Sequence, residues 1–106
     1  MIFHKEINIS LKSCLANTEF SGELYFQPAK RGGIYLTILL QGMDSIHTQT
    51  VLYMEKKHKT IKFPLPAPCQ GLIELCQWSC LPMEDIKQAE FSVYNMNGKK
   101  LMSSQV

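Results

Sequence analysis

The sequence predicts an all-β domain, a small two-sheet β-sandwich of immunoglobulin-like architecture with about seven to eight antiparallel strands. Apolar and polar residues alternate with a period of two, which is typical of half-buried strands. Short apolar runs are separated by Gly, Pro and Asn-Gly turn signals, and there is no long helical segment. With 106 residues, 45% of them hydrophobic and 19% charged, the chain predicts one domain over residues 1–106.

The first half of the chain predicts three strands, over residues 3–13, 22–28 and 34–42. In the first strand, apolar side chains from Phe3 to Leu11 share one face, and polar side chains occupy the other. Residues 29–33, "AKRGG", predict a turn because paired glycines adopt positive φ. The run "IYLTILLQG" is apolar on both faces, so we expect it in the centre of a sheet.

The second half predicts strands over residues 45–55 and 56–65, then a proline-rich loop or edge segment over 64–68. Leu72–Ser79 also carries apolar residues at helical spacing, but a strand is favoured because the segment is short and bounded by prolines. One helical turn is expected near residues 82–87. Asn97-Gly98 lies between two extended runs and predicts a tight type I′ hairpin. The residues expected to face inward are Phe3, Ile7, Ile9, Leu11, Leu36, Ile38, Phe91 and Val93.

Charge and hydropathy narrow the classes of partner. The balance is 11 basic to 9 acidic residues, a net charge of +2, which is too mild to indicate a nucleic-acid groove. The basic run Glu55–Lys59 is interpreted as a solvated loop. No apolar run approaches the roughly 20 residues that span a bilayer, so we expect no transmembrane segment. The N-terminal residues lack the pattern of a signal peptide, although a mature secreted form would look the same.

Residues 63–80 hold three of the four cysteines, Cys69, Cys76 and Cys80, and the only tryptophan, Trp78. Their spacing does not match the paired ligands of a structural zinc site. Cys76 and Cys80 in one straight strand would lie about 13 Å apart, too far for a disulfide, whereas Cys69–Cys80 or a bridge to Cys14 stays open. We interpret the stretch as structural: the thiols pack as small buried groups on one face with the indole, whose N–H finds a carbonyl or water.

The compartment has two interpretations. Free thiols would suit a reducing cytosol, whereas a disulfide together with glycosylation at the Asn8-Ile9-Ser10 sequon would indicate secretion. The localisation therefore stays open.

No motif of a catalytic site is present, neither a nucleophile elbow, a phosphate-binding glycine loop nor paired carboxylates. We therefore expect a protein that is not an enzyme, with no catalytic residues, no cofactor and no metal.

The segments "FPLPAPCQGLIEL" and "AEFSVYNMNGKKL", with the break at Leu81-Pro82 between them, resemble the MD-2-related lipid-recognition domains. The resemblance covers about the last 45 residues and rests on hairpin chemistry. It implies a β-sandwich that holds a lipid between its sheets. Phe63 stands where that family places a cysteine, and "LMSSQV" lacks the cysteine expected after the last hairpin, so no site residue is transferred from the family.

Two functions follow from these observations. The first is a non-enzymatic interaction module that binds a protein partner, or a second copy of itself, through a sheet face or an edge strand. The predicted partner-binding residues are the outward apolar side chains of two strands, Tyr35, Leu39, Val51 and Tyr53. The alternative is a carrier of a lipid or another apolar ligand, of the MD-2-related type. Nucleic acid is not an expected partner.

Overall fold

The computed structural model describes residues 6–16 and 18–104. Eight strands and one short helix lie in this part of the chain, in the order β1 (Ile7–Ser13), β2 (Ser21–Pro28), β3 (Ile34–Gln41), β4 (Thr50–Lys56), β5 (Lys59–Leu65), β6 (Ile73–Ser79), α1 (Met83–Lys87), β7 (Glu90–Tyr94) and β8 (Lys100–Ser103). The all-β class, the strand at Leu72–Ser79 and the helical turn near 82–87 are confirmed. The strand predicted over 45–55 starts later in the structure, where it runs over Thr50–Lys56.

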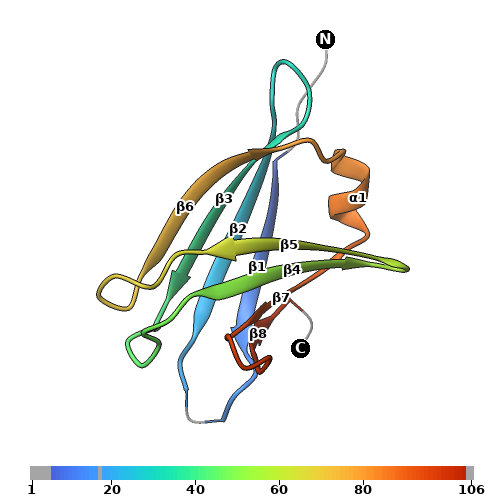
Figure 1. Cartoon of the computed structure of the whole chain (residues 1–106). Coiled ribbons are helices and arrows are strands. Elements are labelled where there is room, and N and C mark those ends of the chain that lie inside the picture. The colour runs from blue at the N-terminus through green and yellow to red at the C-terminus, as the bar shows by residue number, and fades with distance from the viewer. Residues whose placement is uncertain (1–5, 17, 105–106) are drawn as a thin grey trace.

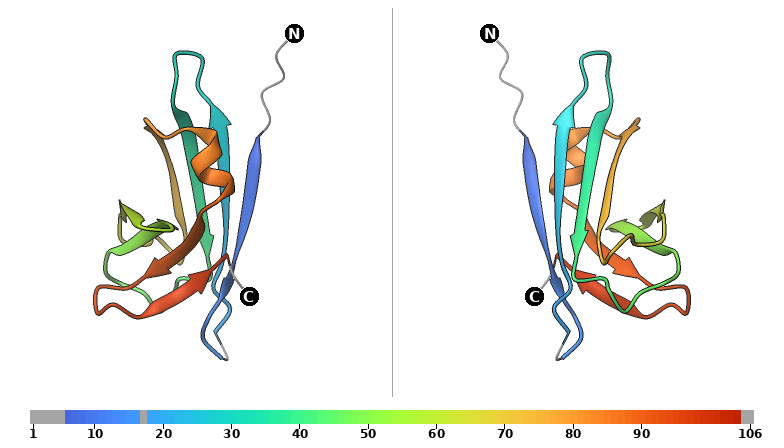
Figure 2. Two further views of the ribbon diagram at one scale, coloured as in Figure 1. Left: turned by 90° about the vertical axis from the view of Figure 1, so that its right-hand side faces the viewer. Right: turned by 90° about the vertical axis from the view of Figure 1, so that its left-hand side faces the viewer.

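The strands form one continuous antiparallel sheet in the order β5-β4-β7-β8-β1-β2-β3-β6. The two separate sheets of a sandwich were expected, but β1 pairs with β8 through Lys12↔Ser103 and Ser13↔Met102. This short ladder joins the two halves, and the sheet curls into a nearly closed, barrel-like shape (Figure 1). β4, β5, β7 and β8 cross in front of β1, β2, β3 and β6 in Figure 1, and the side views in Figure 2 show the two groups as separate layers.

The space between the two layers is filled by one apolar core. Leu11, Leu36, Ile38, Phe91 and Val93 are buried as predicted, and Ile7 and Ile9 are half-buried against the same core. Phe3 lies outside the described residues. Phe26 of β2 and Phe91 of β7 meet with ring centroids 5.3 Å apart, so aromatic packing connects the two layers.

β3 carries apolar side chains on both of its faces, and only one face is covered. Its inward residues, which include Leu36 and Ile38, are fully buried. The outward residues Tyr35 and Leu39 have no layer above them in the described chain and are exposed or half-buried. The strand therefore lies inside the sheet, between β2 and β6, as its composition predicted, but only one of its faces is in the core.

The β7–β8 hairpin is confirmed, although its turn differs from the predicted type I′. Gly98 has φ +81°, whereas Asn97 has no positive φ. The Gly98 N–H donates to the Asn95 carbonyl at 3.1 Å, and the Asn95 N–H donates to the Lys99 carbonyl at 2.9 Å. Asn95 Oδ1 also accepts the N–H groups of Asn97 and Lys99. This is the pattern of a longer loop that ends in a left-handed glycine, and the Asn95 side chain stabilises it.

Candidate functional site

The outward face of β3 and β6 carries the most exposed aromatic side chains of the described strands. The register places Tyr35 opposite Trp78, Thr37 opposite Cys76 and Leu39 opposite Glu74. Trp78 is 53% exposed and Tyr35 is 48% exposed, which is unusual for residues of this size. We call this set the β6 edge surface, defined by Tyr35, Leu39, Glu74, Cys76 and Trp78.

Trp78 is exposed but held in place. Its Nε1–H donates to the Gly32 carbonyl at 3.0 Å. A Cβ atom at Gly33 would lie only 2.7 Å from the indole ring, so the ring packs directly on the glycine backbone. Both glycines have positive φ, +96° and +75°, which is the conformation that the predicted "AKRGG" turn requires. The turn therefore supplies the carbonyl oxygen that accepts the indole N–H and the space in which the ring packs.

A shallow hollow of about 540 Å³ lies beside the indole, on the side of the β2–β3 turn. Its wall combines the two aromatic rings with the basic tip of the turn. The lining residues are Gln27, Pro28, Ala29, Lys30, Arg31, Tyr35 and Trp78. Lys30 and Arg31 are exposed, and within the described chain neither forms an ion pair. Aromatic rings beside an arginine are the combination enriched at the centres of protein interfaces.

The sheet has two edges, because β5 and β6 each bond to a neighbouring strand on one side only within the described residues. β5 carries the features that protect an edge from pairing, namely Lys59, Lys62 and Pro64. β6 has no lysine and no proline, its one charged residue is Glu74, and its register with β3 runs unbroken along the strand. In Figure 1, β6 is the outermost strand of its layer, and β5 diverges from it beyond the loop that joins them. β6 is thus the edge that is free to pair.

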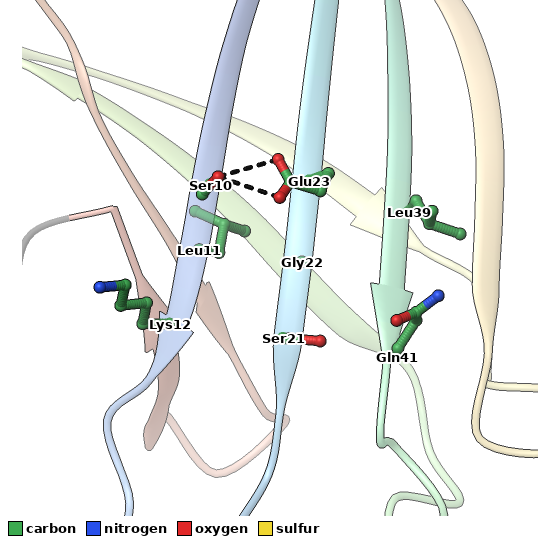
Figure 3. A pocket seen from close by; sticks show the side chains of 8 residues that line it. All are labelled: Ser10, Leu11, Lys12, Ser21, Gly22, Glu23, Leu39 and Gln41. Atoms are coloured by element: carbon green, nitrogen blue, oxygen red, sulfur yellow. Dashed lines mark hydrogen bonds between the residues drawn. The ribbon is translucent and has the colours of Figure 1, made fainter.

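A second hollow, of about 370 Å³, lies on the outer face of β1, β2 and β3 (Figure 3). Ser10 Oγ lies 2.9 Å from each carboxylate oxygen of Glu23, and Lys12 extends away from that carboxylate. The remaining lining residues are Leu11, Ser21, Gly22, Leu39 and Gln41. Ser10 and Glu23 bond to each other across two strands, and the lining includes no aromatic ring, so this hollow offers less to a partner than the hollow beside Trp78.

The four predicted partner-binding residues all point outward, but they do not form one surface. Tyr35 and Leu39 belong to the β6 edge surface on β3. Val51 and Tyr53 are half-buried on β4, which lies in the other layer with four strands between it and β3. There the Tyr53 ring packs on Tyr94 with centroids 4.6 Å apart, and Lys62 Nζ lies 5.3 Å from the Tyr53 centroid.

The interpretation of the cysteines as buried packing groups is wrong, because Cys14, Cys69, Cys76 and Cys80 are all exposed and not disulfide-bonded. The reason is the register of β6. Glu74, Cys76 and Trp78 occupy alternate positions on its outward side, whereas Ile73 and Leu75 face inward. The predicted shared face of Cys76 and Trp78 is confirmed. The indole N–H was expected to find a carbonyl or water partner in a buried position, and it donates to the Gly32 carbonyl from an exposed one. Thr37 Oγ1 lies 3.5 Å from Cys76 Sγ across the strand pair.

Within the described residues, no three His, Cys, Asp or Glu side chains gather where they could hold a metal ion. No helix in that same part of the chain is both long and apolar enough to cross a membrane.

Comparison of the chain with protein-family models, curated proteins and solved structures finds no match. The resemblance of the C-terminal half to MD-2-related domains is therefore neither supported nor contradicted and stays a prediction.

The residues that the sequence reasoning missed as parts of a site are Trp78, Lys30 and Arg31. A signal for Trp78 was present, because the charged Glu74 shares its period-two face and charged residues avoid the core. The position of Lys30 and Arg31 beside the indole depends on β3 pairing with β6, which are separated by two other strands in the sequence, and no local pattern reports that.

Proposed function

We propose that the protein is a non-enzymatic interaction domain that binds an extended strand of a protein partner along the free edge of β6. The observation that carries this proposal is an unprotected edge strand beside an exposed, ordered tryptophan. In this mode, backbone hydrogen bonds to the edge provide affinity, and side chains at alternate positions provide specificity.

The side chains beside the edge provide the specificity that backbone hydrogen bonds alone do not provide. Trp78 and Tyr35 offer large rings whose positions are set by the sheet, so binding orders few additional torsions. Arg31 and Lys30 stand at the end of the same surface and favour a partner with acidic side chains there. Of the residues named from sequence, Tyr35 and Leu39 belong to the proposed site, and Val51 and Tyr53 lie outside it.

The alternative function, a lipid carrier, would place its ligand between the two layers. The inward side chains of both layers form one buried cluster. The two hollows described above both lie on outer surfaces. No specific observation adds to the carrier hypothesis, which stays a prediction from sequence.

Site-specific photo-cross-linking tests the proposed function with a matched pair of tyrosines. A photo-reactive phenylalanine analogue replaces Tyr35 in one variant and Tyr53 in the other, and each is irradiated in cells that produce the protein. We expect a defined protein adduct, from a partner or from a second copy, at position 35 and a much weaker one at position 53. Trp78→Ala should abolish the adduct at position 35, because it removes the central ring of the surface without touching the core.

Two results would contradict the proposed function. One is equal adducts at both positions, and the other is no adduct at position 35 in a variant whose thermal melting matches that of the parent. A lipid mass that stays with the protein in native mass spectrometry, together with absent adducts, would establish the carrier instead.

A further inference from the structure

We propose that the strand which occupies the β6 edge is β6 of a second copy, paired antiparallel about a two-fold axis through Cys76. This inference rests on the proposed function and names its partner. Cys76 is the central residue of the seven-residue strand Ile73–Ser79, so an axis there aligns the whole strand with its copy.

The strand is complementary to itself in this register. On the outward face, Cys76 meets Cys76 of the second copy, and Glu74 meets Trp78 of the second copy. On the inward face, Leu75 meets Gln77 and Ile73 meets Ser79, so the half-buried Leu75, Gln77 and Ser79 gain cover. An axis moved two residues to Glu74 would shorten the overlap and bring two carboxylates face to face, which is unfavourable.

Charge complementarity favours the same pairing. Glu74 is exposed and, within the described chain, has no ion-pair partner. Lys30 and Arg31 border the hollow beside Trp78 and are also unpaired there. Because the second copy runs antiparallel, its Glu74 would stand opposite Trp78, the residue through which this hollow borders the free edge of β6. The symmetry repeats this arrangement at the other end of the interface, so each dimer gains two such contacts.

The interface is small, since one strand pair and its neighbouring side chains define it. We therefore expect a dimer that dissociates on dilution, in the class of weak interfaces that bury less than about 1,200 Å². Sedimentation velocity over a concentration series should show a monomer at low concentration and a dimer at high concentration.

Single-cysteine variants test the register. One variant keeps only Cys76 and another keeps only Cys80, with the remaining cysteines changed to serine; all four are exposed, so both variants should fold. Opposed residues of antiparallel strands have α-carbons about 4.5–5.5 Å apart, within the range that a disulfide bridges. Two Cys80 residues would be separated along the strands by about 26 Å at about 3.3 Å per residue.

Diamide serves as the oxidant, because it takes up the two thiol hydrogens as the sulfur atoms join. At concentrations that populate the dimer, the Cys76-only variant should form a disulfide-linked dimer at least about tenfold faster than the Cys80-only variant. Equal rates for the two variants would overturn the proposed register.

A charge reversal tests the contact between copies independently of the thiols. Glu74→Lys should weaken the dimer about tenfold, since it brings a third positive charge to Lys30 and Arg31. Adding Lys30→Glu and Arg31→Glu to that variant should restore the dimer. Glu90→Lys is the matched control on β7 of the other layer and should change nothing.

The two proposals can fail separately. If the protein stays monomeric at all concentrations while the position 35 adduct contains another protein, the second copy is wrong and the interaction function stands. If neither the dimer nor the adduct forms, both are wrong.

Discussion

Trp78 shows how a single residue is both exposed and ordered. Burial does not hold it, because about half of its surface is open. A hydrogen bond to the Gly32 carbonyl and contact with the Gly33 backbone hold it instead. A ring that is fixed before a partner arrives loses little conformational entropy on binding. The two glycines therefore shape the proposed site although neither has a side chain.

Paired glycine substitutions test this role of the turn. Gly32→Ala meets open space and should cost only the strain of its positive φ, about 1 kcal/mol. Gly33→Ala adds a Cβ that would clash with the Ser79 carbonyl oxygen and lie 2.7 Å from the indole. It should cost at least about 2–3 kcal/mol and displace the ring.

Chemical denaturation measures both costs, and the fluorescence of Trp78, the only tryptophan, reports the ring's environment. An emission spectrum of Gly33→Ala that matches that of the parent would show that the turn does not hold the indole.

At the scale of the element, the protein treats its two edge strands differently. Lysines and a proline protect β5, whereas β6 presents a regular, nearly uncharged edge.

The turn of the β7–β8 hairpin divides two roles between two residues. Gly98 supplies the left-handed backbone, and Asn95 supplies the side-chain acceptor for two N–H groups.

The hairpin geometry predicts different costs at two adjacent positions. Gly98→Val should destabilise the protein by about 1–3 kcal/mol, because φ is +81° although the space around the position is open. Asn97→Ala should stay within about 0.5 kcal/mol, since Asn97 is exposed and has no positive φ. Denaturant midpoints measure both. A large cost at Asn97 would instead support the type I′ turn.

At the scale of the whole molecule, one sheet supplies both layers of the core and two separate outer surfaces. The β1–β8 ladder makes the sheet continuous, and the contact of Phe26 with Phe91 joins the layers across the interior. Residues that are adjacent in the sequence of β3 thus serve different purposes. Ile38 fills the core, and its neighbour Leu39 belongs to the β6 edge surface.

The same substitution at these neighbours separates the two roles. Ile38→Asp buries an uncompensated charge and should cost at least about 3 kcal/mol, enough to unfold much of a marginally stable domain. Leu39→Asp places the charge on the outer surface and should cost less than about 1.5 kcal/mol. Thermal melting of both variants checks this, and similar losses at the two positions would contradict the orientation of β3.

Residue order alone was sufficient to predict the strands and the inward face, because both depend on local periodicity. The alternation in residues 7–11 and the apolar run of β3 identify the buried side chains, and Gly98 marks the last hairpin. The predicted turn type was wrong, since a glycine after Asn97 fits both a two-residue turn and the observed longer loop.

Only the tertiary structure decided which outward residues share a surface. Strand order depends on contacts between segments that are far apart in the chain, so the sequence could not show that Tyr35 lies beside Trp78 or that Tyr53 lies in the other layer. The register of β6 against β3 fixes Cys76 on the outer face, because a shift of one residue would turn it into the core, and Glu74 on the same period-two face had indicated this orientation. The sequence by itself determined an all-β chain with a defined inward face, which local chemistry specifies. The nearly closed sheet, the free edge of β6 and the site beside it follow from long-range pairing, which local chemistry does not specify.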